Sequence, residues 1–257
     1  MTTLYLLSTG PGDSAYLPPI AQQALRQSQH LVAYGLYLDL LGDLTDNKQR
    51  HELPLGKEIE RARLALNLAA KGDNTALISS GDIGIYAMAT LVFELLDHPE
   101  ERSKNPQWQD ISIEVIPGIS AIQALASRVG APIAHDFCTI SLSNLLTPWD
   151  VIEKRLHAAG EGDFVIAFYN PVSHKRQWQL EKAKQILLDY RPATTPVMIG
   201  KNLTRESETI IYTTLENLDI KQVDMLSLVL IGNQESKQIE IKNRIWVYTP
   251  RGYGKKL

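Results

Sequence analysis

Short apolar runs alternate with longer segments of helical periodicity through the first half of the chain. Runs of about four to eight apolar residues bounded by turn residues predict buried strands. The predicted strands are Leu4–Ser8, His30–Tyr34, Asn74–Ser79 and Ile111–Ile116. The predicted helices are Pro18–Ser28, Lys57–Lys71, Ile85–Leu96 and Ile119–Val129. This alternation favours a mainly parallel sheet with helices on its faces.

The alternation restarts after a break at Gly130-Ala131-Pro132, and the last part of the chain is rich in strands. The predicted strands there are Phe137–Leu142, Phe164–Tyr169, Pro196–Gly200, Thr209–Thr213, Leu226–Ile231 and Arg244–Thr249. A helix to Ala158 should begin with Thr147 as N-cap and Pro148 as its first residue, and Trp178–Tyr190 is a second helix. We therefore expect two α/β domains, 1–134 and 135–257.

Composition narrows the class of protein. The 257 residues are 44% hydrophobic and 21% charged, which is typical of a soluble globular chain. A net charge of −3 does not suggest a nucleic-acid-binding protein. The single cysteine, Cys138, excludes an internal disulfide, an iron–sulfur cluster and a cysteine-rich zinc site. No apolar stretch is long enough to cross a membrane, and the N-terminal residues Met1–Tyr5 lack the basic region of a signal peptide, so we expect a cytoplasmic protein.

Three glycine-containing turns follow three of the predicted strands. They are Gly10-Pro11-Gly12, Gly81-Asp82-Ile83-Gly84 and Pro117-Gly118-Ile119-Ser120. Ligands of open α/β sheets bind at the carboxyl ends of the strands, where glycine lets the backbone approach them closely. The turns could each be an ordinary strand-to-helix connection, but together they predict one ligand site.

Several common catalytic motifs are missing. The sequence contains no G-x-x-x-x-G-K-[ST], no G-x-G-x-x-G and no G-x-S-x-G. A P-loop, a dinucleotide site, the usual Rossmann methyltransferase and a serine hydrolase are therefore unsupported. The six histidines are scattered without a His-x-x-x-His pair, so no metal site is predicted.

Some polar residues could carry acid–base chemistry or bind anions. His135, beside Asp136, lies at the expected domain boundary and is either a proton-transfer group or part of a polar hinge. Asp82 is either a proton-transfer group or a turn-forming residue. Basic residues beside proline or asparagine turns could bind carboxylates or could simply be solvated. They are Arg176, Lys201, Arg205 and Arg251.

These motifs together resemble those of the tetrapyrrole methylase family. The family resemblance rests on Gly10-Pro11-Gly12, Ser80–Tyr86 and Ile116–Ala121. Later runs resemble the precorrin-3B C17-methyltransferase subfamily more specifically. They are Gly130–Phe137, Ile140–Trp149, Phe168–Pro171, Val223–Met225 and Thr249–Tyr253. Ile83 stands where the family usually carries proline, a change that still suits a turn.

The resemblance implies two α/β domains of the tetrapyrrole methylase type, with the active cleft between them, and a homodimer. It also implies S-adenosylmethionine-dependent methylation of C17 of precorrin-3B, or of cobalt-precorrin-3. Ring contraction to the precorrin-4 level, in cobalamin biosynthesis, would accompany this step. S-adenosylhomocysteine would be the product of the cofactor. The cofactor contacts carried over by motif are Pro11, Gly81, Asp82, Ile85, Ser120, Ala121, Asn170, Asn202 and Leu203.

The implied chemistry assigns roles to the polar candidates. Methyl transfer needs mainly alignment of the reactants, whereas ring contraction needs a positioned acid or base. The candidates for that role are Asp82, His135 and Lys201. Arg176, Arg205 and Arg251 would bind the carboxylates of the precorrin or cobalt-precorrin macrocycle. Two alternatives stay open: a methylase acting at another ring position, and a carrier that binds a tetrapyrrole or an adenosyl ligand without turnover.

Overall fold

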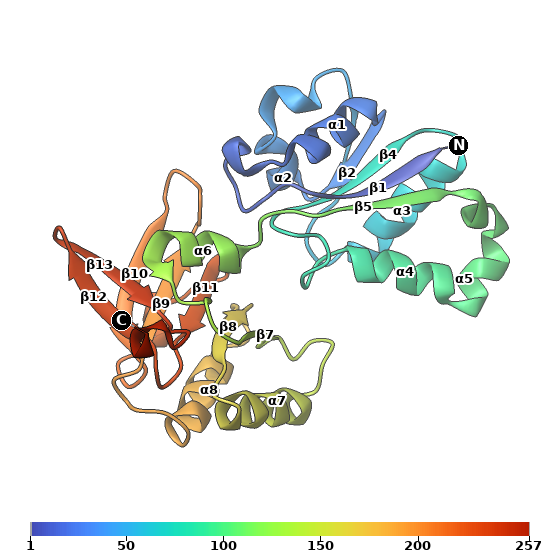
Figure 1. The fold of residues 1–257 in the computed structure, drawn as a ribbon. Coiled ribbons are helices and arrows are strands. Elements are labelled where there is room, and N and C mark those ends of the chain that lie inside the picture. The colour runs from blue at the N-terminus through green and yellow to red at the C-terminus, as the bar shows by residue number, and fades with distance from the viewer. Residues whose placement is uncertain (1, 257) are drawn as a thin grey trace. The chain divides into compact units, whose positions relative to one another are not determined.

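The computed structural model describes residues 2–256 and divides into two compact units, Met1–Ser120 and Ala121–Leu257. Figure 1 follows the chain from the first unit, coloured from blue to green, to the second, which runs from green to red. The division lies earlier than the boundary expected at 134. Helix α6 (Ala121–Val129) and strand β6 (Gly130–Ala131) pack within the second unit, where β6 pairs with β13 (Arg244–Tyr248).

The first unit is built on a five-stranded parallel sheet, as the strand–helix alternation predicts. The order of its strands is β3-β2-β4-β1-β5. The strands are β1 (Thr3–Ser8), β2 (His30–Ala33), β3 (Gln49–Glu52), β4 (Thr75–Ser79) and β5 (Ser112–Ile116). Strand β3 was not predicted from the sequence because this edge strand contains no apolar residue. The adjacent strands β4, β1 and β5 are the three that precede the glycine turns.

Helices cover both faces of this sheet (Figure 1). They are α1 (Pro19–Gln27), α2 (Gly35–Asp39), α3 (Glu58–Ala70), α4 (Ala89–Asp97) and α5 (Pro99–Lys104). Alternate residues of β1 enter the two cores, Leu4 and Leu6 on the side of α3 and α4, Tyr5 and Leu7 on the side of α1. Helix α4 begins after Met88 rather than at Ile85, because Tyr86 has a φ of +52° and interrupts helical geometry.

The second unit contains a mixed sheet with the strand order β10-β9-β11-β8-β7. Strands β7 and β8 are parallel, and the other neighbours are antiparallel. The strands are β7 (Phe137–Ser141), β8 (Val165–Tyr169), β9 (Pro196–Lys201), β10 (Thr209–Thr214) and β11 (Ser227–Ile231). A smaller sheet pairs β13 with both β6 and β12 (Lys237–Ile241), a strand that sequence reasoning missed.

Helices α7 (Trp149–Glu161) and α8 (Trp178–Leu188) pack on one face of the mixed sheet, and α6 packs on the other (Figure 1). Ile166 and Phe168 point to the first core, Val165 and Ala167 to the second. The prediction of Thr147 as N-cap is wrong, since Pro148 holds that position without a side-chain bond. No helix in residues 2–256 is both long and apolar enough to span a membrane.

Candidate active site

The turns after β1 and β4 are joined backbone to backbone. Gly10 N–H donates to Gly81 O at 3.1 Å, and Gly81 N–H donates to Gly10 O at 2.7 Å. Beneath this pair, Thr9 N–H donates to Ser79 O at 3.0 Å. The pairing therefore extends past the ends of the two parallel strands and fixes both turns at the same edge of the sheet.

The third turn is joined to the second through Asp82. Its Oδ1 accepts the Gly84 N–H at 2.8 Å, and its Oδ2 accepts the Gly118 N–H at 3.0 Å. Ile83 N–H also donates to Ser8 Oγ at 2.8 Å. The expectation that the three glycine turns meet at one sheet edge is confirmed. Asp82 forms the turn that its residue type suggested, and both of its oxygens bind backbone amides.

Steric space differs sharply between two of these glycines. A Cβ atom on Gly118 would lie 2.5 Å from both Gly81 O and Ser8 Cβ, so the turns are packed without room for a methyl group. Gly81 has a φ of +72°, and a Cβ atom there would meet nothing within 4 Å. The edge is therefore tightly packed at Gly118 and open beside Gly81. The open space would let a ligand come close to the main-chain atoms of Gly81.

The other predicted cofactor residues of this region occupy the same turns or the start of α6. Pro11 and Ser120 are buried, and Ile85 is half-buried, with its N–H donating to Asp82 O at 3.1 Å. Ala121 is the first residue of α6 and belongs to the second unit. Their backbone positions suit contacts made by main-chain atoms, as the resemblance implies.

A second set of predicted residues gathers at one edge of the mixed sheet. Strands β8 and β9 are both antiparallel to β11 and so run in the same direction, and β7 is parallel to β8. The carboxyl ends of these strands carry Asn170 and Lys201. Asn170 has a φ of +48°, and its Nδ2 donates to Ser141 Oγ at 3.1 Å. The structure thus brings Asn170, Lys201 and the turn after β9 to a common edge.

The turn after β9 has an unusual backbone. Asn202 and Thr204 have φ values of +47° and +62°. Asn202 N–H donates to Leu226 O at 3.2 Å, and Arg205 N–H donates to Asn202 O at 2.9 Å. Leu203 is buried in the core with α6. The predicted cofactor residues Asn202 and Leu203 are therefore held at their backbone by the sheet and by the core.

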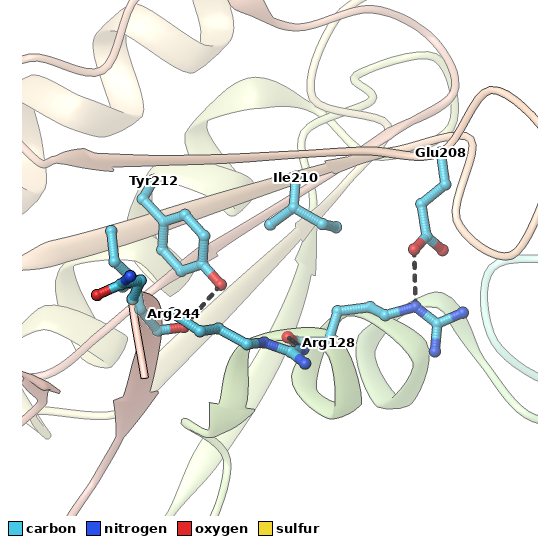
Figure 2. A pocket seen from close by; sticks show the side chains of 7 residues that line it. Arg128, Glu208, Ile210, Tyr212 and Arg244 are labelled. Carbon is cyan, nitrogen blue, oxygen red and sulfur yellow. Dashed lines mark hydrogen bonds and ion pairs between the residues drawn. The ribbon is translucent and has the colours of Figure 1, made fainter. Parts of the chain in front are cut away.

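Sequence reasoning missed Glu208, which lies between this turn and a cavity. Its Oε2 accepts the Thr204 N–H at 2.6 Å, and its Oε1 accepts the Arg128 Nε–H at 2.7 Å. Burial raises the pKa of Glu208, but these hydrogen bonds outweigh burial and leave the pKa below its ordinary value. Figure 2 shows the pair at a cavity of about 390 Å³, whose wall includes Tyr212 and Arg244. No sequence signal links residues 80 positions apart.

The proton-transfer candidates of the second unit lie at different edges of its sheet. Lys201 Nζ lies 3.5 Å from Asp224 Oδ2. Burial raises the pKa of Asp224, but bonds from Ser227, the Leu226 N–H and Lys201 hold it below its ordinary value. His135 precedes β7, where the neighbouring Asp136 O accepts the Val165 N–H at 3.1 Å. This is the end of β7 and β8 away from Asn170, so the structure does not bring His135 to the edge that carries Lys201.

The three predicted carboxylate-binding arginines have different surroundings. Arg176 is half-buried, and its Nη1 donates to Leu142 O at 3.3 Å and to Asn170 O at 3.2 Å. Burial lowers the pKa of its guanidinium. Arg205 is half-buried in the turn after β9, and Arg251 is exposed near the end of the chain. Arg176 thus ties together the segments that follow β7 and β8, whereas Arg251 is open to solvent.

Within residues 2–256, no group of three or more histidine, cysteine or carboxylate side chains could hold a metal ion.

Comparison with known proteins identifies the class to which this fold and these turns belong. Residues 3–219 match the family described as Tetrapyrrole (Corrin/Porphyrin) Methylases, and the chain belongs to that family. The sequence similarity extends over nearly the whole length of two relatives. A probable cobalt-factor III C(17)-methyltransferase of Salmonella typhimurium is 45% identical over 97% of this chain and 99% of its own length. A precorrin-3B C(17)-methyltransferase of a Sinorhizobium species is 40% identical over 98% of this chain and 97% of its own.

Solved structures agree with the sequence comparison. The methyltransferase CobJ superposes with a TM-score of 0.87 at 32% identity, covering 97% of this chain and 100% of that chain. A uroporphyrin-III C-methyl transferase from Thermus thermophilus, complexed with S-adenyl homocysteine, has a TM-score of 0.64 at 20% identity, covering 90% of this chain and 92% of that chain. The second likeness concerns the fold alone. The predicted tetrapyrrole methylase architecture is confirmed.

Proposed function

We propose that the protein is an S-adenosylmethionine-dependent methyltransferase that acts on C17 of a precorrin-3B or cobalt-factor III macrocycle. Ring contraction to the precorrin-4 level accompanies the methylation, as a step of cobalamin biosynthesis. The observation that carries this proposal is the 45% and 40% identity, over nearly the whole chain, to two relatives named as C(17)-methyltransferases. A methylase for another ring position would not be expected to share this level of identity along its full length, since the uroporphyrin-III C-methyl transferase covers 90% of this chain at only 20% identity.

The glycine edge of the first unit supports the cofactor assignment. The closed packing under Gly118 and the open space beside Gly81 leave main-chain atoms accessible to a ligand. When bound, S-adenosylmethionine supplies an activated methyl group on a sulfonium. The predicted contacts are Pro11, Gly81, Asp82, Ile85, Ser120 and Ala121, together with Asn170, Asn202 and Leu203. Most of these would act through the backbone, which positions the cofactor without needing a charged side chain.

Methyl transfer to an electron-rich ring carbon places modest demands on side chains. Direct displacement needs the reacting atoms aligned, and alignment alone is worth effective molarities of about 10⁵–10⁸ M. The hydrogen bonds among Gly10, Gly81, Asp82 and Gly118 fix the turns before any ligand binds. We therefore assign to this edge the role of orienting the reactants.

Ring contraction needs a proton to move, because a ring hydroxyl is deprotonated as carbon migrates. Among the three candidates, Lys201 lies at the edge shared with Asn170 and carries an ammonium near Asp224. Asp82 has both oxygens on backbone amides, which favours a positioning role. His135 is exposed at the other edge of its sheet. Lys201 is accordingly our first choice for the group that holds or moves a proton.

The macrocycle carries many carboxylates, which arginine binds well. Arg205 and Arg251 remain candidates for these contacts. Arg176 would act indirectly, because its Nη1 donates to two backbone carbonyls.

We also propose that the protein is a homodimer and that it works in a reducing cytoplasm. Light scattering of the purified protein tests the oligomeric state.

The decisive experiment incubates the purified protein with S-adenosylmethionine and either metal-free precorrin-3B or cobalt-factor III. Release of S-adenosylhomocysteine and a product one methyl group heavier are expected with at least one of them. Ultraviolet–visible spectra and NMR of the ring then locate the methyl group and establish contraction. A macrocycle that binds without turnover would indicate a carrier instead. Methylation at another ring carbon would indicate a different methylase of the family.

A further inference from the structure

The turn after β9 contains a residue in an uncommon conformation. Asparagine adopts positive φ values readily, so Asn202 at +47° needs no special explanation. Thr204 at +62° is different, because its branched Cβ makes the left-handed region costly. Such backbone conformations persist only where neighbouring groups impose them, and they cluster at ligand sites. Thr204 therefore needs a neighbouring group that holds its backbone in this conformation.

Glu208 is that group. Its Oε2 accepts the Thr204 N–H at 2.6 Å, a charge-assisted bond to the strained residue itself. Its other oxygen accepts the Arg128 Nε–H at 2.7 Å (Figure 2), a bond that favours the orientation in which the carboxylate faces the turn. Arg128 stands at the end of α6, where its carbonyl accepts a bond from Arg244 Nη2 at 2.8 Å. The strained turn is thus connected to α6 and to β13.

We propose that Glu208 is a positioning residue for the cofactor: it holds Thr204 in the left-handed conformation and so presents the Asn202–Leu203 backbone to S-adenosylmethionine. This inference rests on the proposed function, in which Asn202 and Leu203 contact the cofactor. Glu208 itself contacts neither reactant.

Other contacts already secure the fold of the turn, so Glu208 has a separate task. Leu203 is buried in the core, and Asn202 N–H bonds to Leu226 O. These anchors lie before Thr204. The peptide unit after Thr204 is held by the Arg205 N–H, which donates to Asn202 O. What Glu208 adds is a bond to the peptide unit before Thr204, the unit that contains the Leu203 carbonyl. Its loss should therefore affect cofactor binding more than the stability of the protein.

The first test is Glu208→Gln, with Glu206→Gln as the control. An amide has one oxygen, so its NH₂ must face either the Arg128 or the Thr204 donor, and one bond is lost. Glu206 is exposed in the same turn, and its substitution removes the same charge. We expect Glu208→Gln to weaken S-adenosylhomocysteine binding about tenfold by calorimetry, as the loss of one charge-assisted bond allows. The KM for the cofactor should rise similarly, while kcat at saturation stays close to that of the unmodified enzyme.

The second test is rescue by Thr204→Gly in the Glu208→Gln background. Glycine adopts positive φ without strain, so the turn no longer needs to be held. Affinity should return to within about threefold of the unmodified protein, roughly half of a tenfold loss on the free-energy scale. If Glu208→Gln does not fold, Arg128→Gln is tested in its place. This variant removes one of the two bonds to the Glu208 carboxylate and changes no residue of the turn. It should weaken binding, and Thr204→Gly should reverse that loss as well.

Three results would separate the possibilities. Unchanged affinity in Glu208→Gln, or in Arg128→Gln where the former does not fold, overturns the inference. A loss that Thr204→Gly does not reverse also overturns it, because Glu208 would then serve only the fold. If the unmodified protein binds no S-adenosylhomocysteine, the cofactor assignment under the proposed function fails, and the inference that rests on it falls with it.

Discussion

Gly10 and Gly81 exchange two backbone hydrogen bonds, of 3.1 and 2.7 Å, across the carboxyl ends of β1 and β4. This pairing makes the two turns a single rigid element, to which Asp82 adds the third turn through the Gly118 amide. A site built in this way is ordered before its ligand arrives. Binding then costs less conformational entropy than the closure of a mobile loop would.

The first prediction concerns Gly81→Ala. The folded protein has space for the new methyl group, and the positive φ should cost about 1–2 kcal/mol of stability. The affinity of the folded variant for S-adenosylhomocysteine should also fall, because the new methyl group occupies the space proposed for the ligand. Calorimetric titration of the folded variant measures the affinity.

Gly72→Ala is the matched control for that prediction. Gly72 also has a positive φ, +107°, and a Cβ atom on it also meets nothing within 4 Å. It lies before β4, at the edge of the sheet away from the turns. Both variants should lose similar stability, and only Gly81→Ala should lose affinity. Equal affinities in the two variants would remove Gly81 from the site.

The second prediction separates two arginines that looked alike in the sequence. Arg251→Ala should raise the KM for the macrocycle more than the KM for the cofactor, with little change in melting temperature, because Arg251 is exposed. Lys256→Ala, at another exposed basic residue, is the control. Equal effects of Arg251→Ala on the two substrates would argue against a carboxylate contact.

Arg176→Ala should behave differently. Removing the guanidinium leaves the carbonyls of Leu142 and Asn170 without their donor, so the melting temperature should fall. The cofactor KM should rise too, since Asn170 is a proposed cofactor contact.

The third prediction concerns the single cysteine. Burial raises the pKa of Cys138 to about 11. At pH 8 only about one thiol in a thousand is then ionised, and the thiolate is the form that reacts. Iodoacetamide should therefore label the native protein far more slowly than the protein in denaturant. Rapid labelling of the native protein at pH 8 would contradict the raised pKa that partial burial gives this thiol.

Most of the fold could be predicted from the sequence because its central strands are apolar runs. Two strands that lack this signal were missed. Gln49–Glu52 has no apolar residue, and Lys237–Ile241 is exposed along its whole length. The start of α4 was predicted too early because nothing in the sequence reveals the positive φ of Tyr86.

Those parts of the candidate site that particular residue types mark could be predicted from the sequence. Glycine and asparagine mark the turns at which the backbone must take unusual conformations, and Gly81, Asn170 and Asn202 have positive φ values. Contacts between distant residues could not be predicted. Asp82 bonds to Gly118, 36 positions away, and Glu208 bonds to Arg128, 80 positions away. The separation of His135 from Lys201 depends on strand direction, which the sequence alone did not define.

The fourth prediction decides what Asp82 does. Proton transfer and turn positioning were both open from the sequence, and the two bonds from Gly84 and Gly118 favour positioning. In Asp82→Asn, the amide NH₂ must face one of these two N–H donors, so one turn is released. If Asp82 positions the turns, cofactor affinity should fall, and methyl transfer and ring contraction should slow together.

A proton-transfer role gives a different result in the same variant. Methyl transfer would continue, and a methylated but uncontracted macrocycle would accumulate, since a positioned acid or base contributes about 10²–10⁴-fold to its own step alone. Because the extruded carbon can stay attached as an acyl group, mass alone does not distinguish the two macrocycles, and ring NMR is needed. Asp110→Asn, at an exposed residue before β5, is the control for the loss of charge. Accumulation of the uncontracted product in Asp82→Asn would refute the positioning role and place Asp82 ahead of Lys201 as the group that moves the proton.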